Sequence, residues 1–255
     1  MSDPASCSGP RGVLLVHGAW FTGRAWDGVA DALRARGIPV AVAELHRGCL
    51  AADIAAAEAA LDEIADFGPA VACGHSYGGS VISGLSPGRL AHLVYLAAMV
   101  PDVGETSLGL LASAPSGLET AMVGDPDEVT TIDPARAGEL FFAHLPEGER
   151  TARVAALVPQ RMAAGRDAAT SAAWRARPST YVVCGEDRAV HPELQARLSR
   201  RTGRAVAWAS DHAAFASHPT DVVDLLSRLA TSESGAERRG VAGEPARGAG
   251  TVLRG

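Results

Sequence analysis

The sequence predicts a doubly wound α/β fold in which a mostly parallel, six-stranded sheet carries helices on both faces. Short apolar runs without polar alternation are typical of parallel strands that are buried on both sides. Helical segments separate these runs, as expected for βα units. The chain has 255 residues, 47% of them hydrophobic and 20% charged. This length is sufficient to bury a core without disulfides or metals.

The first half of the predicted sheet begins with the apolar run at residues 12–17. A helix is expected at residues 24–37, because Val29 and Leu33 fall on one face and Gly37 stands where a helix ends. The second and third expected strands are residues 38–43 and 70–74, with an Ala-rich helix at 51–67 between them. These segments together predict a βαβαβ unit with right-handed crossovers.

The second half of the sheet follows the same rhythm after one interruption. The further elements expected are a helix at 77–85, strands at 90–99, 180–184 and 205–208, and helices at 190–201 and 220–230. Parallel strands of this kind place their carboxyl ends at one edge of the sheet, where ligands bind in doubly wound folds.

The alternation stops between residues 101 and 177, which contain short helical segments, Pro and Gly breaks and large apolar side chains. We expect this insert to form a helical cap over the ligand-binding edge of the sheet. The core is then residues 12–100 and 178–230. Residues 1–11 and 231–255 are expected to be disordered tails, because the second of these has almost no apolar content.

A candidate nucleophile follows the third predicted strand. The sequence GHSYG, residues 74–78, matches the pattern G-x-S-x-G. The flanking glycines permit a sharp turn between strand and helix that lifts the Ser76 hydroxyl above the sheet edge. The alternative is an ordinary Gly-rich turn in which the serine only caps a helix.

A serine hydroxyl needs a general base, which a third group must hold in place. His212 follows the last predicted strand, where a loop can place its imidazole over Ser76. His218 is the alternative base, although it opens the final predicted helix. For His17 and His75 we favour backbone hydrogen bonding in tight turns.

The acid of such a site is expected after the strand at 180–184. Asp187 is the preferred candidate, because it falls deeper in the loop after Gly185. Glu186 and Asp211 are the alternatives, and all three carboxylates also fit ordinary solvated turns.

Acyl transfer further requires hydrogen-bond donors for the developing oxyanion. One expected donor is the backbone amide of Tyr77, the residue after the candidate nucleophile. The other is the amide of Ala19, in the HGAW sequence that follows the first strand. An ordinary glycine turn is the alternative interpretation of this second segment.

The sequences VLLVHGAW, GHSYGG, YVVCGEDR and SDHAAFASHP occur in this order and resemble the α/β-hydrolase superfamily over about residues 12–230. The resemblance is closest to a small single-domain subgroup that includes plant methylesterases, hydroxynitrile lyases and bacterial esterase-like proteins. It implies that Ser76 is the nucleophile, His212 the base and Asp187 the orienting acid. It also implies that Ala19 and Tyr77 supply the amides of the oxyanion hole.

This resemblance also bears on the sheet. The chain starts almost at the strand before HGAW, so we expect the superfamily's first two strands to be missing, leaving a six-stranded sheet.

Residue types narrow the reactions that the resemblance allows. The superfamily's dehalogenases and epoxide hydrolases use a carboxylate nucleophile, whereas this chain has Ser76. Its epoxide hydrolases also use tyrosines of the cap, whereas the tyrosines of this chain, Tyr77, Tyr95 and Tyr181, lie outside the cap. All 23 basic residues are arginines, so the lysine of the related hydroxynitrile lyases is absent. Hydrolysis of an ester or thioester remains the leading prediction. The alternatives are a non-hydrolytic enzyme of secondary metabolism (a cyclase, an acyltransferase, or a catalyst of C–C bond formation or cleavage) and a ligand-binding receptor.

The predicted substrate is a small to medium apolar or aromatic molecule. We expect the pocket to be lined by Trp20, Phe141, Phe142, Met162 and Trp174, which are large apolar side chains of the cap and the HGAW loop. The alternative for each of them is packing between the cap and the sheet.

Composition argues against several other classes of partner. The net charge of −6 gives no support for nucleic-acid binding, and the longest apolar run, residues 90–100, is too short to span a membrane. The first residues resemble no signal peptide, so a cytoplasmic location is expected. The four cysteines are scattered, as reduced thiols usually are. The sequence contains no nucleotide-binding loop and no Cys/His cluster, so it predicts no cofactor and no metal. No feature of the sequence indicates an oligomeric state.

Overall fold

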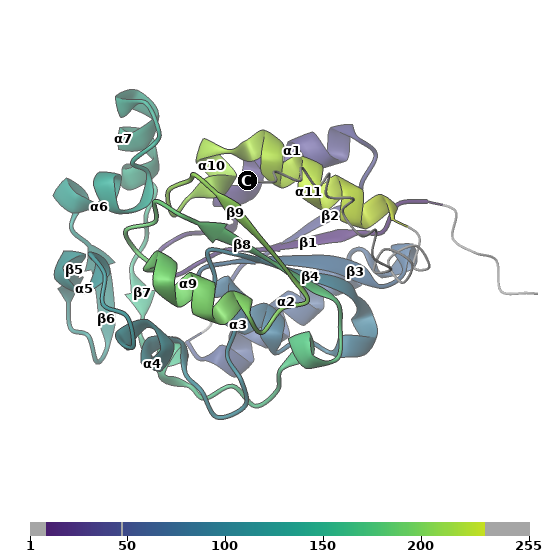
Figure 1. Ribbon diagram of the computed structural model, residues 1–255, viewed down its shortest axis with the longest axis horizontal. Helices are drawn as coiled ribbons and strands as arrows, with labels where there is room; N and C mark the ends of the chain where they lie inside the picture. The colour runs from purple at the N-terminus through teal and green to yellow at the C-terminus, as the bar shows by residue number, and fades with distance from the viewer. Residues whose placement is uncertain (1–8, 47, 233–255) are drawn as a thin grey trace, which may run out of the picture.

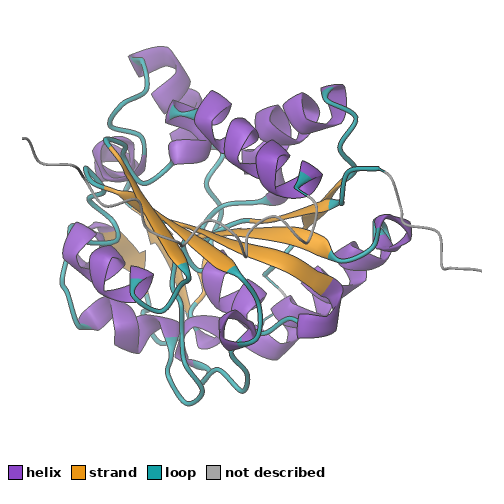
Figure 2. Ribbon diagram, turned by 45° about the vertical axis from the view of Figure 1, so that its right-hand side comes forward, coloured by secondary structure: helices purple, strands orange, loops and turns teal. Residues whose placement is uncertain are grey.

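The computed structural model describes residues 9–46 and 48–232 (Figures 1 and 2). The predicted tails, residues 1–11 and 231–255, therefore lie almost wholly outside the described residues. At the beginning of the described chain, the Arg11 amide donates a hydrogen bond to the Ala230 carbonyl at 2.9 Å. This bond joins the segment before the first strand to the end of the last helix.

One parallel sheet forms the centre of the molecule, with strand order β2-β1-β3-β4-β8-β9. Its strands are β1 (Val13–Val16), β2 (Val40–Ala43), β3 (Ala70–His75), β4 (Leu90–Leu96), β8 (Ser179–Cys184) and β9 (Arg204–Trp208). Every residue of β1 and β3 is buried, since helices cover both faces of these inner strands. The predicted six-stranded, doubly wound sheet is confirmed.

Helices flank this sheet on both sides (Figures 1 and 2). One face carries α1 (Asp27–Ala35), α10 (Ala214–Ser217) and α11 (Pro219–Thr231), and the other carries α2 (Leu50–Asp62), α3 (Gly78–Ser83) and α9 (Pro192–Ser199). The first helix ends before Gly37, whose φ of 74° suits a residue without a side chain. No helix in the described ranges is long and apolar enough to cross a membrane.

The insert at residues 101–177, called the cap below, contains both helices and strands, so the prediction of a purely helical cap is corrected. Its elements are α4 (Ser107–Ala112), α5 (Leu118–Ala121), β5 (Met122–Gly124), β6 (Val129–Ile132), α6 (Pro134–Phe141), α7 (Glu147–Ala155), β7 (Gln160–Arg161) and α8 (Ala163–Arg166). The three strands form an antiparallel sheet in the order β5-β6-β7. The alternating burial and β-branched residues of β6 account for this sheet.

One contact joins the two ends of the cap, and others attach it to the core. Trp174 donates from Nε1 to the Pro101 carbonyl at 2.9 Å, which ties the last part of the cap to its first residue. Arg201, in the loop after α9, donates from Nη2 to Glu105 Oε1 at 2.9 Å and from Nη1 to the Val100 carbonyl at 2.7 Å. The cap is thereby held close to the carboxyl ends of β4 and β8.

Candidate active site

The candidate nucleophile lies in the turn between β3 and α3. Ser76 has a φ of 53°, the left-handed conformation that few side chains adopt. The turn is tight, because a Cβ atom on Gly74 would lie 2.5 Å from the Gly78 carbonyl oxygen. The Ser76 amide donates to the Leu96 carbonyl at 3.2 Å, and the Ser76 carbonyl accepts from the Met99 amide at 3.0 Å. These bonds fix the turn against the end of β4.

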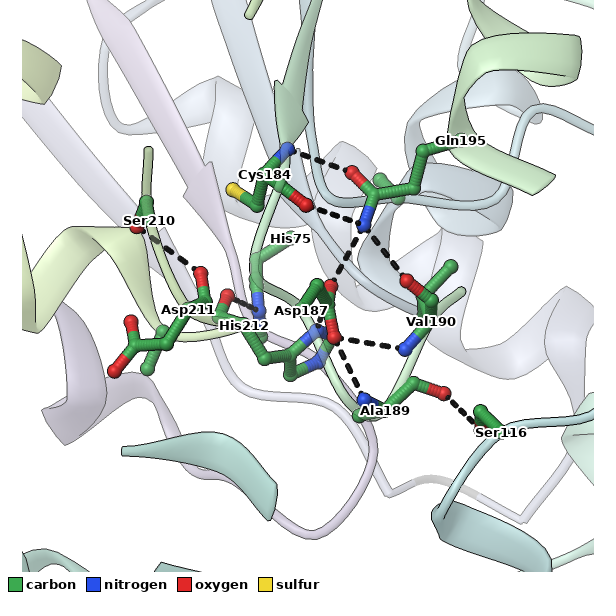
Figure 3. Close-up of polar contacts among 12 residues, drawn as sticks. His75, Ser116, Cys184, Asp187, Ala189, Val190, Gln195, Ser210, Asp211 and His212 are labelled. Carbon is green, nitrogen blue, oxygen red and sulfur yellow. Dashed lines mark hydrogen bonds and ion pairs between the residues drawn. The ribbon is translucent and has the colours of Figure 1, made fainter. Parts of the chain in front are cut away.

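The candidate base and acid form a buried pair in the loops after β9 and β8 (Figure 3). His212 Nδ1 lies 2.7 Å from Asp187 Oδ2, and the two residues are 1% and 4% exposed. A carboxylate accepts hydrogen bonds, so the imidazole Nδ1 is the donor and the proton of the neutral ring belongs there. The Nε2 atom is then an acceptor, and His212 lines the same cavity as Ser76.

The Asp187 carboxylate has further donors, which offset the cost of burying its charge. Its Oδ1 accepts from the amides of Ala189 at 2.7 Å and Val190 at 2.8 Å. Its Oδ2 also accepts from the Gln195 side chain at 2.8 Å (Figure 3). Gln195 is completely buried, and its Oε1 accepts from the Cys184 amide at 2.9 Å.

Sequence analysis did not identify Gln195. The available signal was a glutamine on the same face of α9 as two buried leucines, Leu194 and Leu198. A polar residue on a buried helix face has to find a hydrogen-bond partner.

The alternative acids and the alternative base have other partners. Asp211 accepts from the His144 amide at 2.9 Å and from the Ser217 hydroxyl at 2.7 Å. Glu186 lies 3.0 Å from His144 Nε2, at an exposed position. His218 Nδ1 lies 3.0 Å from the Ser217 hydroxyl oxygen. Asp211 and Glu186 therefore hold the cap, whereas Asp187 holds His212.

Two buried histidines near the site make backbone hydrogen bonds. His75 donates from Nε2 to the His212 carbonyl at 3.0 Å (Figure 3), and its burial, together with the nearby His212, lowers its pKa well below the ordinary value. His17 donates from Nδ1 to the Gly18 carbonyl at 2.9 Å and accepts from the Leu45 amide at 3.1 Å. Burial lowers the pKa of His17 to about 4. Both rings are therefore neutral near pH 7.

The two residues expected to supply the oxyanion donors, Ala19 and Tyr77, both line the same cavity as the serine. In the part of the chain that the structure describes, neither backbone amide donates to a protein acceptor. The loop carrying Ala19 runs close to the serine, because a Cβ atom on Gly18 would lie 2.8 Å from Ser76 Cβ. The Tyr77 hydroxyl donates to Asp53 Oδ2 at 2.8 Å, which anchors its ring to α2.

The cavity lies between these core loops and the cap, and its free volume is about 50 Å³. Its wall consists of Ala19, Trp20, Ser76, Tyr77, Met99, Ser107, Leu108, Leu111, Leu118, Phe141, Gln160, Arg161, Met162, Gly165, Ala189, Val190 and His212. Three of the predicted pocket residues, Trp20, Phe141 and Met162, are among them. A wall that is mainly apolar with a few polar groups is typical of a small-molecule site.

The other two predicted pocket residues lie elsewhere, so their assignment is corrected. Phe142 packs against Phe21 with ring centroids 5.9 Å apart and borders a separate surface hollow. Trp174 bonds to Pro101 at the base of the cap and lies under the Arg175 guanidinium. Both are packing residues. The Phe142 ring contacts another aromatic ring and the Trp174 indole bonds to a backbone carbonyl, and neither residue lines the cavity.

The cap holds Trp20 at two points. Its indole Nε1 lies 3.2 Å from both the carbonyl and the hydroxyl oxygens of Thr130 on β6. Its carbonyl accepts from the Val158 amide at 2.9 Å. Trp20 also has a φ of 62°, a strained conformation for a residue with a large side chain. The cap therefore holds the residue that follows Ala19 in place.

A resident metal has no evident ligand set in the described ranges, where no three His, Cys, Asp or Glu side chains are grouped suitably. Cys73 and Cys184 are buried free thiols, and burial raises the pKa of both.

The family pattern of the Alpha/beta hydrolase family matches residues 13–225, and the chain belongs to this family. A relative, the alpha/beta hydrolase nvfD of Aspergillus novofumigatus, is 28% identical over 193 residues, covering 70% of this chain and 77% of its own. The carbendazim hydrolyzing esterase of a Nocardioides species is 32% identical over 114 residues. That match covers 40% of this chain and about half, 47%, of the esterase.

Solved structures share the fold at lower sequence identity. A pyrethroid hydrolase from Sphingobium faniae aligns with a TM-score of 0.74 and 20% identity, covering 89% of this chain and 99% of that one. Polyneuridine aldehyde esterase aligns with a TM-score of 0.73 and 16% identity, covering 86% of this chain and 98% of that one. The methylesterase MES16 from Arabidopsis is also among the structural neighbours, with a TM-score of 0.69 and 19% identity over 86% of this chain and 98% of that one.

Proposed function

We propose that the protein is a serine hydrolase that cleaves a carboxylic ester or thioester through an acyl-enzyme on Ser76. The observation that carries this proposal is the buried His212–Asp187 pair, joined at 2.7 Å, beside the cavity that Ser76 and His212 share. Membership of the Alpha/beta hydrolase family and relatives named as esterases support it.

The proposed reaction has two steps. The Ser76 hydroxyl attacks the ester carbonyl while His212 Nε2 accepts its proton, and ionised Asp187 stabilises the resulting imidazolium. The carbonyl oxygen becomes an oxyanion, which accepts hydrogen bonds from the Ala19 and Tyr77 amides. His212 then gives its proton to the leaving alkoxide or thiolate. In the second step, water attacks the acyl group with the same base and releases the acid and Ser76.

The cavity supports a substrate of apolar or aromatic character. Aliphatic, methionine and aromatic side chains make up most of its wall.

The experiment that tests the proposal combines a fluorophosphonate label with hydrolysis of p-nitrophenyl butyrate. Ser76→Ala should abolish labelling and reduce turnover by about 10⁴-fold or more. The matched control is Ser86→Ala, at an exposed serine outside the cavity, and it should behave as wild type. Labelling of wild type without ester turnover would favour the non-hydrolytic alternative. If the wild-type protein is not labelled, the assignment of Ser76 as the nucleophile is wrong.

A further inference from the structure

A polar side chain in the cap forms part of the cavity wall opposite the reactive loops. Gln160 lies on β7, pairs with Thr130 of β6, and is 4% exposed. It lines the same cavity as Ser76 and His212. The candidate reaction does not use this residue.

The orientation of the Gln160 amide is fixed by one hydrogen bond. Its Nε2 lies 2.7 Å from the Arg161 carbonyl oxygen. A carbonyl can only accept, so the nitrogen must be the atom at that position and the oxygen must be the other one. Gln160 Oε1 is fully buried and has no hydrogen-bond partner among the residues that the structure describes. A buried acceptor without a donor is uncommon and costs free energy.

Two of the wall side chains that could donate to Gln160 Oε1 are already engaged. The Trp20 Nε1 is directed to Thr130. The Ser107 hydroxyl lies 2.7 Å from the Ser80 hydroxyl. Arg161 also lines the cavity, but it is exposed and does not donate to Gln160 Oε1 in the part of the chain that the structure describes. Most of the remaining wall on the cap side is leucine, methionine and phenylalanine, whose side chains offer no donor. A ligand is therefore a natural source of the missing hydrogen.

We infer that Gln160 Oε1 selects a substrate that carries a hydroxyl or N–H group on an otherwise apolar or aromatic body. The inference rests on the proposed function, because it assigns a subsite of the same cavity. A site that hydrogen-bonds a donor discriminates against an analogue without one, since binding of that analogue leaves the acceptor buried and unpaired. An ether or carboxylate oxygen at this position has no proton to give and is rejected for the same reason.

Binding to the Ser76→Ala protein tests this subsite separately from catalysis. The probes are methyl phenylacetate, its three ring-hydroxylated isomers and the matching methoxy compounds, measured by titration calorimetry. At least one hydroxylated isomer should bind roughly tenfold more tightly than the unsubstituted and methoxy esters. Adding Gln160→Met, which preserves length and removes the acceptor, should abolish this preference. Leu108→Met, an apolar change in the same wall, should preserve it.

Two results would overturn the inference. One is a hydroxyl preference that survives in both Gln160→Met and Gln160→Leu, and the other is equal binding of all probes to the parent protein. Thermal melting of each variant establishes that it is folded. Hydrolysis by the wild-type chain separates this test from the proposed function. Selective binding without any hydrolysis would contradict only the proposed hydrolase function. Hydrolysis without selective binding would contradict only the proposed Gln160 subsite.

Discussion

Two buried polar side chains near the cavity, Asp187 in a core loop and Gln160 in the cap, differ in how completely they are hydrogen-bonded. On the core side, the Asp187 carboxylate has four hydrogen-bond partners, and Gln195 is itself held at both ends of its amide. On the cap side, Gln160 Oε1 is buried and has no hydrogen-bond partner within residues 9–46 and 48–232. From this difference we infer that the core fixes the geometry of the proposed reaction, whereas the cap selects the ligand.

The architecture of the core and of the cap agrees with these two roles. The core loops follow strands of a six-stranded parallel sheet, so their backbones have regular supports. The cap has a three-stranded sheet of very short strands and helices of at most nine residues among its described elements. Substitutions in the core loops should therefore change the rate, and substitutions in the cap should change selectivity.

The largest effect that tests this comparison is expected at Asp187. Asp187→Asn should reduce kcat for p-nitrophenyl butyrate by about 10³- to 10⁴-fold, because a neutral amide neither stabilises the imidazolium nor keeps the histidine tautomer. Steady-state kinetics on folded protein measures this loss. Glu186→Gln is the matched control and should change kcat less than twofold. The reverse order of the two effects would assign the acid to Glu186.

A smaller effect is expected at Gln195, which positions Asp187 without touching substrate. Gln195→Met should lower kcat by roughly tenfold with little change in KM, since a lost supporting hydrogen bond loosens the acid and base. The NMR signal of the His212 Nδ1 proton should shift or broaden in this variant. Glu193→Gln, on the exposed side of the same helix, should leave both unchanged. An unaltered proton signal in Gln195→Met would reduce Gln195 to a packing residue.

The contact between the cap and the HGAW loop should have a weaker influence. Thr130→Val removes the hydroxyl that Trp20 Nε1 approaches at 3.2 Å but retains the carbonyl of the same residue. We expect a loss of about two- to fivefold in kcat, the size of a partly retained neutral hydrogen bond. The exposed neighbour Thr131→Val provides the control. Equal kinetics for the two variants would show that this contact does not affect the loop.

The smallest effect concerns stability and pH at the Glu105–Arg201 ion pair between cap and core. Hydrogen bonding to the Arg201 guanidinium holds the pKa of Glu105 below its usual range. A lowered folded-state pKa stabilises the protein above the unfolded value of about 4.3, and this contribution disappears as pH falls through the folded value. Because both side chains are partly exposed, Glu105→Gln should cost less than about 1 kcal/mol at pH 7.

Thermal melting at two pH values measures this contribution. Tm of Glu105→Gln should fall by about 1–3 °C at pH 7 and by less at pH 3. Asp127→Asn removes a more exposed pair within the cap and should have a smaller effect. A Tm difference for Glu105→Gln that is independent of pH would rule out the charge as its cause.

The sequence was sufficient to predict the sheet, and the hypotheses for the nucleophile, base and acid likewise depend on local patterns. Buried strands and the glycines around Ser76 are visible within a few neighbouring residues. The small cap sheet was missed, since strands of two to four residues give too little periodicity to detect. Ala97, with a φ of 47°, also ends β4 at Leu96, earlier than predicted.

The side-chain environments depended on contacts between distant segments, which the sequence does not display. Gln160 and Gln195 differ from ordinary surface glutamines only in what packs around them. Phe142 and Phe141 are adjacent, yet only Phe141 lines the cavity. The catalytic roles of Ser76, His212 and Asp187 remain predictions until the proposed variants are measured.

The double attachment of Trp20 has a mechanical consequence. Thr130 and Val158 in the cap hold this residue by its indole and by its carbonyl, and Ala19 precedes it directly in the chain. Any outward swing of β6 must either break these bonds or pull the Ala19 amide away with the cap. Trp20 thus couples the position of the cap to the position of the Ala19 amide, one donor of the proposed oxyanion hole. A cap movement that carried Ala19 along would displace this proposed donor, and the reverse movement would return it.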